Sequence, residues 1–156
     1  MSYLVTGLPL EPFRPLFGLS ASALAEQGVT RCTVDAYPGF PCRVTLEDVQ
    51  PGESVLLLNY EHQSADTPYR SCNAIFVSER ACETRRILNE IPAVLALRKF
   101  ISLRAFDEAG VMLDAEVAPG AELEPVIARL LAIRGCAYLH AHNAGPGCYA
   151  ARIDWA

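Results

Sequence analysis

The chain has 156 residues, a length that fits one domain and is sufficient to bury a real core. Its 13 basic residues are scattered and its formal net charge is −5, so we expect no basic patch and no nucleic-acid partner. Hydrophobic residues make up 51% of the sequence, which fits either a well-filled core or an apolar surface covered by a second copy in a homodimer.

No segment of the sequence predicts targeting or membrane insertion. The first residues, MSYLVTGLPLEPF, lack a basic region, and Gly7 and Pro9 interrupt their apolar stretch. No run approaches the roughly 20 apolar residues that a spanning helix needs. We therefore expect a cytoplasmic protein with no membrane partner, whose six cysteines are reduced thiols. The cysteines contain no CxxC pair, which argues against a zinc knuckle or a thioredoxin-like site.

The N-terminal half of the sequence predicts several short strands and one short helix. The helix lies within 20–28, because Ser20 fits the N-cap position and a glycine follows the last turn. Thr45 and Asp48 have the spacing of a capping box, which predicts one helical turn before the next Pro-Gly turn. Apolar runs and alternation, bounded by turn residues, predict strands over 3–8, 29–36, 54–62 and 74–79.

The C-terminal half predicts a hairpin, a longer helix and a second hairpin at the end. A proline leaves the segment 80–97 ambiguous, because it interrupts a pattern that is otherwise helical. Residues 99–106 and 111–117 flank DEAG, a good hairpin turn. Residues 121–135 predict a helix with one apolar stripe. Because strands dominate, we expect an α+β fold: a single domain over 1–156, mainly an antiparallel sheet with about two helices packed on it.

The final segment, YLHAHNAGPGCYAARIDWA, carries two of the chain's three histidines on one predicted strand. Side chains alternate along a strand, so His140 and His142 share one face, while small or apolar residues occupy the other. If residues 143–147 form the loop, Cys148 lies opposite His142 and Ala150 lies opposite His140. This arrangement gathers two imidazoles, a thiol, a phenol and a guanidinium on one face, which indicates a binding or catalytic surface.

The histidines have three interpretations. His140 and His142 can direct two nitrogens at one metal ion, and His62, at the end of a buried predicted strand, would complete a three-histidine site if that strand neighbours the hairpin. Without a metal, the imidazoles could bind an anion or transfer protons in catalysis. Alternatively, His140 and His142 are half-exposed strand residues that hydrogen-bond to neighbouring carbonyl groups.

Two loops supply further candidates. Cys42 adjoins Arg43, whose charge would favour a reactive thiolate, and a histidine base would then complete a nucleophilic site. The alternative is a small buried thiol that only packs. Arg70, in the loop that follows His62, and Arg104 both have the fork geometry that clamps a carboxylate or phosphate. Most arginines in such positions instead bind loop carbonyls or form surface pairs.

These stretches also carry a resemblance to a known family. The segments PGFPCRVTLEDVQPGE, LLLNYEHQ, TPYR, IFV, ISLRAF and YLHAHNAGPGCYAARID resemble those of small bacterial proteins grouped as domain of unknown function 1203. The resemblance implies a bacterial, cytosolic, single-domain protein and no particular reaction. The sequence departs from the family pattern at SCNAIFV, where a Gly-Pro is expected, and at Trp155. The family motif positions are Pro41, Cys42, Arg43, His62, Pro68, Tyr69, Arg70, His140, His142, Asn143, Gly147 and Cys148.

Three functions follow from these patterns. We favour a small-molecule binding protein or enzyme, with a polar pocket formed by the Cys42 loop, the His62–Arg70 loop and the C-terminal hairpin, because converging polar side chains are costly to bury unless they serve a ligand. The second is metal binding through the three histidines, and the third is a protein-interaction module without catalysis. The cofactor stays open. The candidate catalytic residues are Cys42, His62, His140 and His142, and the candidate ligand-binding residues are Arg43, Tyr69, Arg70, Asn143 and Cys148.

Overall fold

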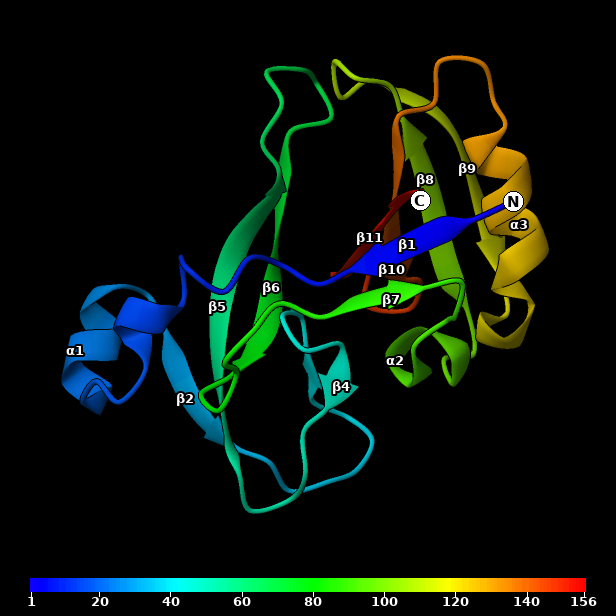
Figure 1. Cartoon of the computed structure of the whole chain (residues 1–156). Helices are drawn as coiled ribbons and strands as arrows, with labels where there is room; N and C mark the ends of the chain where they lie inside the picture. The colour runs from blue at the N-terminus through cyan, green and yellow to red at the C-terminus, as the bar shows by residue number, and fades with distance from the viewer.

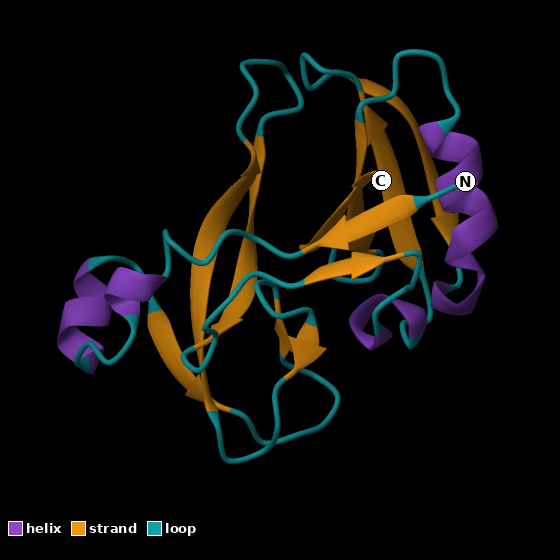
Figure 2. Ribbon diagram, viewed as in Figure 1, coloured by secondary structure: helices purple, strands orange, loops and turns teal.

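The computed structural model describes residues 1–156 and confirms the α+β class. The strands form two sheets rather than one, and the longest helix lies on the outer side of one of them (Figures 1 and 2). The first sheet has the spatial order β7 (Arg86–Leu88), β1 (Tyr3–Thr6), β11 (Tyr149–Trp155), β10 (Tyr138–Asn143), β8 (Ile101–Phe106) and β9 (Met112–Ala118). The second sheet has the order β2 (Thr30–Thr33), β5 (Ser54–Gln63), β6 (Ser71–Ser78), β3 (Pro41–Cys42) and β4 (Glu47–Asp48). Neighbouring strands are antiparallel, except that β3 runs parallel to β6.

Helix α3 (Leu123–Leu131) covers the outer face of the first sheet. Its predicted apolar stripe is buried there, and Ile127 and Leu130 share a cluster of 18 buried residues with Leu139 and Ala141 of β10. Full burial of one such leucine or isoleucine contributes roughly 1.5–3 kcal/mol. This packing directs Leu139 and Ala141 of β10 toward α3. The opposite face of β10 is therefore directed toward the second sheet. No helix of the structure combines the length and apolar character needed to cross a membrane.

The first part of β5 is buried on both faces, at Val55 and Leu56, whereas Asn59 and Glu61 farther along the strand are exposed. Val55 belongs to a cluster of 12 buried residues that also includes Tyr149 of β11, so this cluster joins the two sheets. Leu56 points the other way and packs on Leu24 of helix α1 (Ala21–Glu26). Ser20 caps α1 as expected, because its hydroxyl accepts a hydrogen bond from the backbone N–H three residues later at 3.1 Å.

One segment differs from the sequence prediction, and a second segment is one that the sequence left ambiguous. The helical turn expected before the Pro-Gly turn is absent, and Asp48 instead lies in β4. Its carboxylate accepts hydrogen bonds from the backbone N–H of Gly39 at 3.2 Å and from Arg98 at 3.0 Å, so tertiary partners replace the capping interaction with Thr45. The ambiguous segment 80–97 contains β7 and the short helix α2 (Ala93–Ala96), which begins directly after a proline.

Candidate functional site

Strand β10 directs His140 and His142 toward the inside of the molecule, where the two sheets meet. Their neighbours Leu139 and Ala141 belong to the apolar cluster under α3, so the histidines point to the opposite side of the sheet. Both histidines are almost completely buried, with 4% and 1% of their surface exposed. The predicted sharing of one strand face by the two histidines is therefore confirmed, because alternation along the strand leaves no other arrangement.

The pairing of the final hairpin differs from the expected register. Tyr149 lies opposite His142, where we expected Cys148, and Arg152 lies opposite His140. The connection between His142 and its partner is one residue longer than expected, which places Tyr149 opposite His142. A bulge between this pair and the pair Ala141–Ala151 shifts the register by one further residue, so Arg152 lies opposite His140. As a result, a phenol ring and a guanidinium, rather than a thiol, lie beside the two imidazoles.

The third histidine completes the cluster from the second sheet. His62 lies near the end of β5, and its ring centroid is 4.9 Å from that of His142 and 5.8 Å from that of His140. One ring nitrogen from each of the three residues lies within 4.8 Å of the other two. All three histidines of the sequence therefore meet where β5 approaches the β10–β11 hairpin.

Three ring nitrogens in this cluster are buried without a hydrogen-bond partner: Nδ1 of His62, Nδ1 of His140 and Nε2 of His142. The Nδ1 atom of His142 lies 2.9 Å from the carbonyl oxygen of Gly147. Because a carbonyl only accepts, this Nδ1 donates, and the proton is fixed on it. The lone pair on Nε2 of His142 is therefore free. Burying unpaired nitrogens is costly, which favours a ligand that meets them.

Burial keeps the three imidazoles neutral. It lowers the pKa of His140 from 6.5 to about 3, and the charges of the neighbouring histidines and arginines add to the effect. The pKa values of His62 and His142 fall to about 4, again mainly through burial, with a further contribution from the charge of Arg104. Because a metal binds neutral imidazole, all three histidines are in the ligand form at neutral pH.

Tyr149 holds the three imidazole rings in place. Its ring stacks on His62 with centroids 5.2 Å apart and planes 14° from parallel. It also meets His140 and His142 edge-on, with centroid distances of 5.1 and 5.8 Å. Tyr149 is 2% exposed, so this buried ring packs against all three imidazoles.

Two arginines flank the cluster, one on each strand next to β10. Arg104 of β8 and Arg152 of β11 both pair with His140 across the sheet. Asp154 neutralises Arg152 through an ion pair of 2.7 Å. Arg104 forms no ion pair, and its hydrogen bond is to the Ser102 hydroxyl at 3.4 Å. The surroundings of the imidazoles are therefore positively charged, which opposes their protonation.

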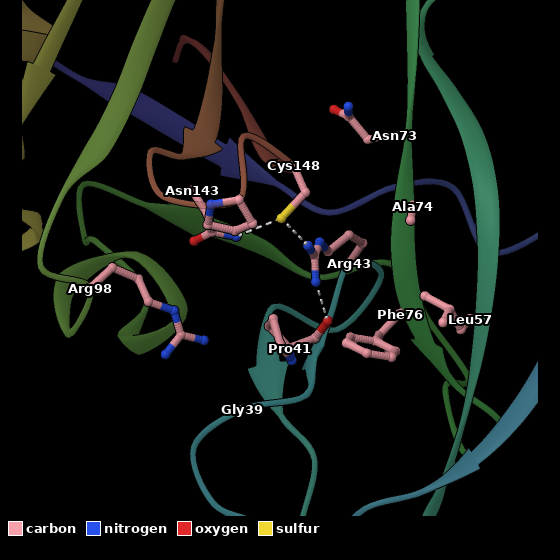
Figure 3. A pocket seen from close by; sticks show the side chains of 11 residues that line it. Gly39, Pro41, Arg43, Leu57, Asn73, Ala74, Phe76, Arg98, Asn143 and Cys148 are labelled. Carbon is pink, nitrogen blue, oxygen red and sulfur yellow. Dashed lines mark hydrogen bonds between the residues drawn. The ribbon is translucent and has the colours of Figure 1, made fainter.

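Three of the predicted ligand-binding residues line a separate cavity of about 540 Å³ (Figure 3). They are Arg43, Asn143 and Cys148, and they form one hydrogen-bonded group. The Cys148 sulfur accepts bonds from Nη2 of Arg43 at 3.2 Å and from Nδ2 of Asn143 at 3.4 Å. None of the three histidines lines this cavity, so the histidine cluster and the cavity are two candidate sites that share the same hairpin.

The other three candidate residues lie in neither site. Cys42 is 1% exposed, and its sulfur accepts the backbone N–H of Ser78 at 3.2 Å. This thiol is enclosed by the packed interior, which is the environment that the packing alternative describes. Arg70 forms an exposed ion pair with Glu61 at 2.9 Å. Tyr69 is 40% exposed and does not line this cavity.

The residues of these sites that were not selected from the sequence include Tyr149 and Arg98. Tyr149 contacts every ring of the histidine cluster, and its only sequence signal is its position beside Cys148 in the distinctive final segment. Arg98 lines the cavity from the turn that follows α2. No local sequence pattern predicts this role of Arg98, because only the tertiary fold brings that turn next to the hairpin.

The fold and the site together define an α+β protein with a buried cluster of three histidines. The chain belongs to the family described as "Protein of unknown function (DUF1203)", whose model matches residues 39–155. The matched range includes both candidate sites, while β1, α1 and β2 precede it. No curated protein and no solved structure matches the chain.

Proposed function

We propose that the chain is a metal-binding protein in which His62, His140 and His142 hold one divalent transition ion. The observation that carries this proposal is the convergence of one nitrogen from each imidazole to within 4.8 Å of the others. The alternative, histidines bonded to neighbouring carbonyls, accounts for His142 alone, because the buried Nδ1 atoms of the other two have no partner.

The cluster fits an ion of the zinc class. A four-coordinate zinc ion forms bonds of about 2.0–2.1 Å to imidazole, which places its ligand nitrogens about 3.3 Å apart. Nitrogens now within 4.8 Å of one another reach this spacing through small side-chain rotations. Three imidazoles and no carboxylate select a zinc-like, cobalt or copper ion over calcium and magnesium, which require oxygen ligands. A fourth position stays open for water or an anion, and the unpaired Arg104 favours an anion.

Metal loading of untagged protein tests this proposal. After removal of bound metal with EDTA, titration with Co²⁺ should give the visible absorption of a four-coordinate site and saturate at about one ion per chain. His62→Ala should weaken binding at least about tenfold, since it removes one of three ligands from a half-buried position without opening the core. Asn59→Ala, on the same strand and exposed, is the matched control and should bind like wild type.

Two results would contradict the proposal. The first is wild-type protein that takes up no stoichiometric Co²⁺ or Zn²⁺ at neutral pH. The second is His62→Ala protein that binds as tightly as Asn59→Ala, because the ion would then lie elsewhere. Circular dichroism of both variants verifies that each is folded before the comparison is made.

A further inference from the structure

The cavity beside the final hairpin has a polar wall and an apolar wall. Arg43, Asn143 and Cys148 form the polar wall, and Leu57, Ala74 and Phe76 of the second sheet lie across from it (Figure 3). Its volume of about 540 Å³ lies within the range of pockets that hold small organic molecules. The size and the two-sided lining suit a ligand with one charged end and one apolar end.

Arg43 is a buried charge without a carboxylate partner. It is 3% exposed, and its guanidinium bonds the carbonyl oxygens of Tyr149 at 2.7 Å and Pro41 at 2.8 Å and the sulfur of Cys148 at 3.2 Å. Three of its five N–H groups are thereby used, and two remain without a protein acceptor. Buried charges are ordinarily paired, because burying an isolated charge is costly. The charge of Arg43 is therefore able to pair with an anion from outside the chain.

The remaining polar groups of the lining add no negative charge. Arg98 is a second cation at the wall, and its ion pair with Asp48 at 3.0 Å offsets its charge. The Asn143 amide donates to Cys148, while its side-chain oxygen is buried without a partner. The cavity therefore keeps the net positive charge of Arg43, and no carboxylate of the chain lines it.

We propose that this cavity binds a small organic acid, with its carboxylate at Arg43 and its apolar body against Phe76 and Leu57. A carboxylate supplies the two planar acceptors that a guanidinium fork recognises. The apolar wall selects an acid that carries a hydrocarbon body over a bare inorganic anion. Binding at this cavity requires no metal at the histidine cluster, because none of the three histidines lines the cavity.

Equilibrium dialysis of metal-free protein, kept in EDTA, tests the proposal with benzoate and hexanoate as probes. Benzamide, which has the same body as benzoate but no charge, should bind at least about tenfold more weakly, because it lacks the charge-assisted bonds to Arg43. Inorganic phosphate, which has charge but no apolar body, should also bind more weakly than benzoate. Failure of both acids to bind, or equal binding of benzoate and benzamide, overturns the proposal.

Two further experiments test where the acid binds. Ala74→Phe places a large side chain in the cavity from an exposed position and should abolish benzoate binding, whereas Ala25→Phe, exposed on α1, should not. Bound benzoate should also slow the alkylation of Cys148 by iodoacetamide and leave that of the exposed Cys72 unchanged, as followed by peptide mass spectrometry. Benzoate that binds Ala74→Phe as tightly as wild type lies outside the cavity and contradicts the assignment.

Discussion

Acidification of the metal-free protein should destabilise it strongly between pH 7 and pH 5. Burial lowers the folded-state pKa of His140 to about 3 and those of His62 and His142 to about 4, from 6.5. Between about pH 4 and 6.5 the unfolded chain therefore binds more protons than the folded chain. The contribution of the neutral imidazoles is fully present above this window and is lost as the pH falls through it.

The magnitude follows from these pKa values. For a histidine whose pKa falls from 6.5 to 4 or below on folding, a change from pH 7 to pH 5 removes about 1.9 kcal/mol of stability. His140 and His142 are nearly fully buried, and together they account for about 4 kcal/mol. His62 is half-buried and screened by solvent, so we assign it about 1 kcal/mol. The expected loss of about 5 kcal/mol is comparable with the whole stability of a small domain.

Urea unfolding in EDTA, followed by circular dichroism at several pH values between 5 and 7.5, measures this loss. The chain has no other histidine, and Glu79, whose pKa is lowered to about 2 mainly by its hydrogen bond to Arg31, loses its contribution only below its ordinary value of 4.5. His62→Gln should reduce the loss of unfolding free energy between pH 7 and pH 5 by about 1 kcal/mol, the contribution assigned to this half-buried ring. A free energy of unfolding that changes by less than about 1 kcal/mol from pH 7 to pH 5 refutes the reasoning, because the imidazoles would then protonate freely in the folded state.

Further predictions concern backbone packing and the thiols. Gly7→Ala should cost about 1–3 kcal/mol in urea unfolding, because a Cβ at this position would lie 2.1 Å from the carbonyl oxygen of Val44. Gly39→Ala, where nothing lies within 4 Å, should stay within about 0.5 kcal/mol of wild type, and equal losses in both variants would contradict the packing. All six cysteines are free, so thiol titration of freshly prepared, denatured protein without reductant should count six, whereas a count of four or fewer would indicate disulfides.

The elements that the sequence predicts well depend on local signals. The apolar stripe and flanking residues of 121–135 predict α3, and the Ser20 cap predicts α1. Both predictions succeed because helix periodicity and capping act within a few residues. The shared face of His140 and His142 also followed from alternation alone. In these cases tertiary packing and local preference agree.

The features that the sequence did not predict depend on contacts between distant segments. The longer connection of the final hairpin makes Tyr149 the partner of His142, and a bulge makes Arg152 the partner of His140; no local pattern specifies either feature. Asp48 does not cap a helical turn, because its carboxylate forms an ion pair with Arg98, which lies far along the chain. The division of the strands into two sheets is likewise set by tertiary pairing.

The candidate site was predicted only in part for the same reason. Residue type correctly marked the histidines as a group, but their meeting depended on where β5 lies relative to the hairpin. Residue type could not separate Arg43, which is buried beside a cavity, from Arg70, which pairs with Glu61 at the surface. Cys42 next to Arg43 resembled an activated thiol, yet its burial decides its role. Burial and the available partners, rather than residue type, distinguish these side chains.

X-ray absorption spectroscopy of the zinc-loaded protein at the zinc edge tests the proposed metal site most directly. The three-histidine site predicts three imidazole nitrogens at about 2.0–2.1 Å, with the outer-shell scattering of their rings, and an oxygen in the remaining position. The spectrum should lose one imidazole in His62→Ala. Sulfur scattering at about 2.3 Å, or an all-oxygen shell without imidazole, would contradict the assignment of the ion to His62, His140 and His142.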